Sequence, residues 1–86
     1  MDDPDRPGAS FLRADLDLAN SFLDIADTTR QVNVRNRNIA NAWKAHDAVV
    51  RLAPKVGIKD SELIAITERL RVLRTRLERM EAQDSK

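Results

Sequence analysis

Large apolar residues recur at alternating steps of three and four through the last third of the chain. They are Leu63, Ile66, Leu70, Leu73, Leu77 and Met80. This rhythm places all six on one stripe of a single helix, which is the arrangement of a seam that packs against other helices. It predicts a helix over residues 60–82, capped by Asp60 or Ser61. A stripe of this kind needs further amphipathic helices to bury it, so it constrains the fold more than any other feature.

Two such helices are predicted upstream. Residues 10–28 carry a broad apolar face that we assign to the core, with Ser10 as N-cap. The face begins with Phe11 or Leu12 and continues with Leu16, Leu18, Ala19, Phe22, Leu23, Ile25 and Ala26. Residues 31–54 form the second helix, and its helically spaced positions are Ile39, Ala42, Trp43, His46, Val49, Val50 and Ala53.

Local signals mark the ends of the second helix. Thr28 and Gln31 have the spacing of a capping box, which predicts a start of the second helix there. Asn33 is an alternative N-cap, which predicts a later start. Pro54 lacks an amide donor, and Gly57 is expected to supply a left-handed stop. The boundaries of this helix follow from these four residues.

The fold class predicted is all-α, an antiparallel three-helix bundle over residues 10–82. Residues 1–9, rich in proline and aspartate, are expected to form a disordered acidic tail, and residues 83–86 a frayed C-terminus. A chain of 86 residues has room for one modest core, and a deep catalytic cleft is not expected.

Composition excludes several kinds of site. The chain has no cysteine, which rules out disulfides and thiolate chemistry, and it has only two glycines, neither in a phosphate-binding motif. His46 has no helical neighbour expected to orient it, since Asp47 is adjacent and points elsewhere. We therefore expect no enzyme activity, no cofactor, no metal and no small-molecule substrate. An acidic start and the lack of a long apolar run favour a cytoplasmic protein without a membrane span.

Residues 16–54 resemble the helical hairpin of a tetratricopeptide unit. The carrying residues are Ala42 and Pro54 in the second helix and the Leu18-Ala19 pair followed by Phe22 in the first. His46 stands where that family usually has an aromatic residue, and Val49 where it has alanine. The resemblance implies a protein-interaction module in which the third helix caps the hairpin, and it supplies no ligand-binding residues.

A basic ridge is predicted on the second helix. Its cations, spaced by seven residues with one more a turn later, are Arg30, Arg37, Lys44, Arg51 and Lys55. Such a ridge could follow a nucleic-acid backbone. The competing interpretation is that the acidic residues of the first helix neutralise it, and a net charge of only +1 without interleaved aromatics favours this second reading.

Three apolar residues are candidates for a protein interface. Trp43 is either core filler or, if partly exposed, an interface anchor. Ile64 and Val72 project away from the main stripe of the third helix, where they could serve self-association. The function predicted is thus a small helical protein-interaction module with a protein partner, a homodimer through the third helix being one form and a nucleic-acid-associated protein the alternative.

Overall fold

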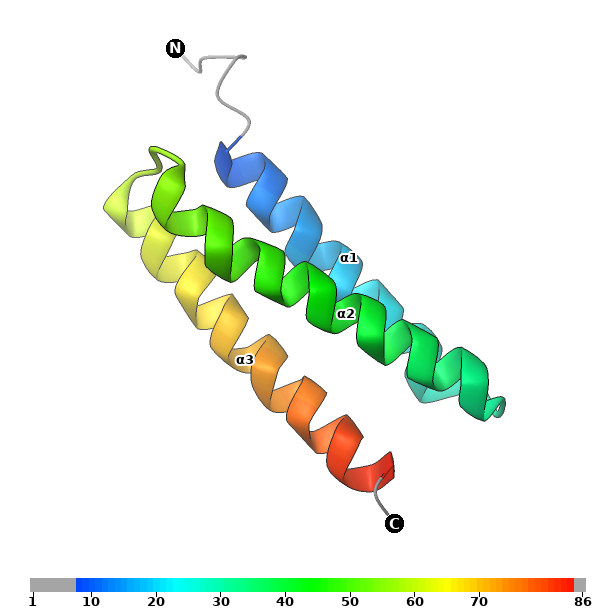
Figure 1. Ribbon diagram of the computed structural model, residues 1–86. Coiled ribbons are helices and arrows are strands. Elements are labelled where there is room, and N and C mark those ends of the chain that lie inside the picture. The colour runs from blue at the N-terminus through cyan, green and yellow to red at the C-terminus, as the bar shows by residue number, and fades with distance from the viewer. Residues whose placement is uncertain (1–7, 85–86) are drawn as a thin grey trace.

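The computed structural model describes residues 8–84, which form three helices lying side by side (Figure 1). The helices are α1 (Gly8–Thr28), α2 (Val32–Leu52) and α3 (Asp60–Asp84), and the 3-10 turn η1 (Ala53–Lys55) follows α2. Short turns reverse the chain twice, so the bundle is antiparallel and elongated, measuring 49 × 20 × 17 Å. The predicted all-α three-helix bundle is confirmed.

The outer helices extend beyond their predicted ends. Residues 8 and 9, expected in the tail, form the first turn of α1, and α3 continues through residues 83 and 84, which were expected to fray. The rest of the predicted tail, residues 1–7, and residues 85–86 lie outside the described part of the chain.

The start of α2 differs from both predicted caps. Thr28 remains the last residue of α1, where its hydroxyl donates a 3.0 Å hydrogen bond to the Asp24 carbonyl, and the N-cap position of α2 is occupied by Gln31. Gln31 precedes the helix in an extended conformation and forms no side-chain cap. Instead, the backbone N–H of Gln31 donates a hydrogen bond to the Thr29 hydroxyl oxygen at 3.2 Å. Local back-bonding by threonine therefore replaces the capping box.

The end of α2 follows proline, while the prediction for glycine was wrong. Pro54 lies within η1, whose tighter turn tolerates the missing amide at its start. No glycine among residues 8–84 has a positive φ, so Gly57 does not provide a left-handed stop. The chain leaves the turn through Val56 in extended conformation instead, with φ −96° and ψ 141°.

The principal core lies between α1 and α2, which share the most extensive contact in the bundle. Alternating large and small side chains meet there, because Ala19 and Ala26 of α1 and Ala42 of α2 let the two backbones approach closely. The fully or nearly fully buried residues of this pair are Leu12, Leu16, Ala19, Leu23, Ala26, Ile39, Ala42, His46 and Val49, and Ala53 of η1 adjoins them.

Helix α3 closes one face of this hairpin with its predicted stripe. Ile66, Leu73, Leu77 and Met80 are buried, whereas Leu70 is half-buried and Leu63 is 36% exposed at the start of the helix. The stripe is therefore core at four of its six positions, and α3 is held less extensively than α1 and α2 hold each other.

Polar contacts also attach α3 to the hairpin. Asp17 of α1 pairs with Arg69 at 2.6 Å, and Asp24 pairs with Arg76 at 2.8 Å. From α2, Arg35 donates hydrogen bonds to the carbonyls of Ala26 and Met80, at 3.4 and 3.1 Å. One guanidinium thus joins all three helices at a single end of the bundle.

The α3 stripe yields a stability prediction. We expect Leu73→Ala to lower the free energy of unfolding by about 2 to 5 kcal/mol, because it removes a side chain that is 1% exposed and leaves a cavity. The adjacent Val72→Ala, at a position 55% exposed, should change it by less than about 0.5 kcal/mol. Urea denaturation followed by circular dichroism measures both, and equal losses would contradict the assignment of the buried side of α3.

Candidate interaction surface

A second row of apolar side chains runs along α1 beside the row that builds the core. Phe11, Leu18 and Ile25 follow one another at intervals of seven residues and are 52%, 48% and 47% exposed. Phe22 fits the same row, with one edge packed on the core and the rest open to solvent. With Asp15 between them, these residues repeat at steps of four and three, which is the spacing of a helix-packing seam.

Helix α2 carries a matching second row made of smaller side chains. Every member is half-buried, and the spacing again alternates between four and three. The row consists of Val34, Asn38, Asn41, Ala45, Ala48 and Leu52. Both helices of the hairpin therefore have two seams, of which only one is fully buried within the described chain.

The two second rows belong to the same face of the hairpin. On α1, the contacts with α3 come from the flank that holds Asp17 and Asp24, and helical geometry puts the row of Leu18 on the opposite flank. On α2, Ile39 and Trp43 face α3, and the row of Ala45 lies on the other side. We call the two rows together the open face, since α3 covers the reverse side of the hairpin.

The open face corrects one part of the sequence prediction. Phe11, Leu18 and Ile25 were assigned to the core, but a helix buried on about one third of its circumference cannot turn a row 100° away toward the same neighbours. The repeated interval of seven in this row does not separate it from the core row, because Leu12, Ala19 and Ala26 recur at the same interval one residue later.

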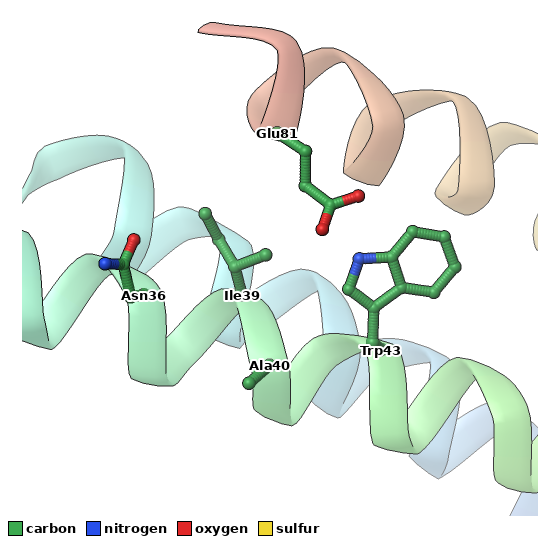
Figure 2. Close-up of a pocket in the computed structure, with 5 residues that line it drawn as sticks. All are labelled: Asn36, Ile39, Ala40, Trp43 and Glu81. Atoms are coloured by element: carbon green, nitrogen blue, oxygen red, sulfur yellow. The ribbon is translucent and has the colours of Figure 1, made fainter. Parts of the chain in front are cut away.

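Trp43 is half-buried between α2 and α3, so it fills part of the core and keeps part of its surface exposed. Its ring packs against the core and meets the ring of His46 edge-on at 5.3 Å between centroids. It also lines a surface groove of about 400 Å³ with Asn36, Ile39 and Glu81 (Figure 2). The indole Nε1 is turned toward the Glu81 carboxylate in that view, is itself buried, and forms no hydrogen bond with the described residues.

The structure does not bring Ile64 and Val72 together with Trp43. Both lie on the outer side of α3, with exposures of 70% and 55%. Two turns of helix separate them, and Glu68 and Arg71 form an exposed ion pair in the segment between. The hydrogen bond and charge of Arg71 lower the pKa of the Glu68 carboxyl, in that order of importance. The outer side of α3 is therefore a charged surface with two separate aliphatic residues.

The basic ridge is exposed, and its cations form no direct ion pair with the acidic residues of α1. Arg37, Lys44 and Arg51 lie along the outer edge of α2, while Arg30 precedes that helix and Lys55 is in η1. None of these five cations pairs with another residue between 8 and 84. Two acidic residues of α1 turn instead to Arg69 and Arg76 of α3, because α3 lies on their flank and the ridge does not.

His46 is buried, as its position in the helical pattern suggests, but it does have a polar partner. Its Nδ1 lies 2.9 Å from an Asp47 carboxylate oxygen, although adjacent residues of a helix were expected to diverge. The ring is 6% exposed, whereas the aspartate side chain is largely in solvent. An N–H at Nδ1 donating to the carboxylate satisfies the buried ring and orients it against Trp43.

Among residues 8–84, no group of three His, Cys, Asp or Glu side chains is placed to hold a metal ion. Within the same residues, none of the helices combines the length and apolar character needed to cross a bilayer.

Comparisons with known proteins find no relative of this chain. No protein-family model matches the chain, and neither the curated proteins nor the solved structures yield a match. The open face, the Trp43 groove and the basic ridge are consequently interpreted from their own chemistry.

The unpartnered indole of Trp43 gives a second prediction. We expect Trp43→Ala to cost about 3 kcal/mol of unfolding free energy through lost packing. Trp43→Phe should cost less than half as much, because it keeps much of the ring and removes a buried donor whose lack of a partner costs about 1 to 3 kcal/mol. Denaturation curves of both variants decide this, and equal losses would mean that the indole N–H is satisfied.

Proposed function

We propose that this chain is a small, non-enzymatic helical module that binds protein through the open face. The observation that carries the proposal is the pair of second seams, one on each helix of the hairpin. Isolated exposed apolar residues are common on any protein surface, whereas a contiguous apolar band is typical of an interaction site.

The chemistry of the open face fits a helical partner. Side chains spaced at steps of four and three offer alternating knobs and holes to a helix lying along them, while an extended peptide would need exposed backbone edges that helices lack. The aromatic rings of Phe11 and Phe22 supply the large apolar area that anchors such contacts.

The proposed module is similar to a single tetratricopeptide-like hairpin. Ala19 and Ala42 occupy the close contact between α1 and α2, which supports this kind of helix pairing. In this proposal α3 takes the place of a capping helix on one face of the hairpin and leaves the other face for the partner, and the module acts in the cytoplasm.

The open face is favoured over α3 as the place of binding. Ile64 and Val72 are separated by charged residues, and a partner covering them would have to cover the Glu68–Arg71 pair as well. Trp43 lies between α2 and α3, where it stabilises the bundle and borders the groove beside Glu81. We therefore assign binding to the rows of Leu18 and Ala45.

Site-specific photo-crosslinking in the native cell tests the proposal. A photo-reactive phenylalanine analogue at position 18 should give protein adducts, whereas the same residue at exposed position 75 of α3 should not. Ile25→Asp should suppress the adducts from position 18, because it places a charge in the same row, and Ile64→Asp should leave them unchanged. Equal adducts at both positions, or none at position 18, would contradict binding through the open face.

A second candidate function rests on the unpaired basic ridge. Arg37, Lys44 and Arg51 project from one edge of α2 without an ion pair to another described residue, so they are available to an anion. Their spacing along about two turns per step would follow a polyanionic backbone such as that of a nucleic acid.

Salt dependence tests this second function. The chain should bind a duplex or single strand at about 50 mM salt and lose affinity steeply toward about 200 mM, because each phosphate contact releases a counterion. Replacing all three cations with glutamine should reduce the slope of log affinity against log salt by about 2 to 3. An unshifted electrophoretic band at the lower salt concentration would remove the nucleic-acid function.

A further inference from the structure

We infer that the partner of the open face is a second copy of this chain, docked about a two-fold axis that runs parallel to the helices. This inference rests on the proposed function and names its partner. The dimer would be a four-helix bundle made of two hairpins packed face to face, with each α3 on an outer surface.

The open face is self-complementary in size. Its α1 row holds large side chains such as Phe11 and Leu18, and its α2 row is slimmest at Ala45 and Ala48. A two-fold rotation can place α1 of each copy over α2 of the other. In both of the resulting contacts, the large residues of α1 then pack on the small residues of α2. The alternative two-fold rotation stacks α1 on α1 and α2 on α2, which crowds large residues together and leaves small residues facing small ones.

Charge selects the same arrangement. Of the aspartates of α1, Asp17 and Asp24 are paired with α3 on the reverse flank, whereas Asp15 lies on the open face. Placing α1 over the second copy's α2 brings Asp15 toward the edge that carries Lys44, whereas α1 on α1 would join two rows that both carry Asp15. The ridge cations left unpaired within one copy then lie at the edge of the interface.

The residues also agree in height along the bundle. Rotation about an axis parallel to the helices leaves every residue at its own level, and equal counting from the turn at residues 29–31 puts Leu18 level with Ala42. Leu18 of the second copy therefore lies beside Asn41 and Ala45 of the first copy. Helix α1 of the second copy runs antiparallel to α2 of the first copy, just as α1 and α2 do within one chain. Every neighbouring pair of helices in the dimer is therefore antiparallel, as in an up-and-down bundle.

Two polar residues determine the strength of the association. Asp15 and Asn41 are half-buried on the open face and form no side-chain hydrogen bond with another described residue. Covering them costs desolvation, which offsets part of the apolar gain. Dimerisation is consequently reversible and depends on concentration.

Analytical ultracentrifugation tests the inference. The average mass of the full chain should rise toward twice the monomer mass as concentration increases to about 1 mM. Leu18→Asp, or the milder Leu18→Ser, should raise the dissociation constant at least about tenfold while the helical circular dichroism spectrum is kept. Ile64→Asp is the matched control and should leave association unchanged. A strict monomer over this range, or an effect of Ile64→Asp alone, would overturn the inference.

Thiol cross-linking distinguishes the two arrangements, since the chain contains no native cysteine. A mixture of the single variants Leu18→Cys and Asn41→Cys, treated with a short bifunctional thiol reagent, should give a linked dimer containing one of each. Leu18→Cys alone should remain unlinked. Linkage of Leu18→Cys to itself as the main product would overturn the arrangement with α1 over α2.

The failure of this inference can be told from failure of the proposed function. If the wild-type chain is monomeric while position 18 photo-crosslinks a different protein in the cell, the open face binds protein but not a second copy. If position 18 gives neither self-adducts nor other protein adducts, both are overturned.

Discussion

The close packing of α1 against α2 is the contact on which the rest of the structure depends. Alanines at positions 19, 26 and 42 bring the two backbones together, and leucine and valine side chains fill the space between those close approaches. This hairpin fixes the direction of both helices, and therefore which flank of each one faces α3 and which faces solvent. The ion pairs of α1, the Arg35 bridge and the open face all follow from that placement.

Each helix of the hairpin has two seams separated by roughly a quarter of its circumference. The inner seam is occupied by the other helix and by α3, while the second seam remains half-exposed. A domain of this size gains little stability from a single core, so an additional buried face is a common means of stabilising short chains. The same geometry that makes the hairpin compact thus leaves a surface suited to another helix pair.

The sequence predicted the number, order and approximate limits of the helices, because the periodic apolar positions and Pro54 act locally. It did not separate the core row of Leu12 from the exposed row of Leu18, since the two rows adjoin on α1 and both are apolar. Only the position of α3 decides which row is covered. The ion pairs of α1 could not be predicted for the same reason, as Asp17 and Asp24 pair with Arg69 and Arg76 of α3.

Side-chain contacts that join distant parts of the chain could not be predicted from the sequence either. Arg35 reads as one more cation near the basic ridge, yet it reaches the carbonyls of Ala26 and Met80. Its position on the inner flank of α2 determines this role. Likewise, the local rotamers of His46 and Asp47 allow a contact that helical spacing alone did not indicate.

Small-angle X-ray scattering at increasing concentration tests the central claim most directly. Two copies docked side by side about an axis parallel to the helices should double the forward scattering divided by the protein concentration. The longest dimension of the helical part should stay near the 49 Å of one copy. Scattering from a single copy at every concentration would contradict the docking of a second copy on the open face. A doubled mass with a much longer particle would do so as well, because it would place the contact at the ends of the bundle.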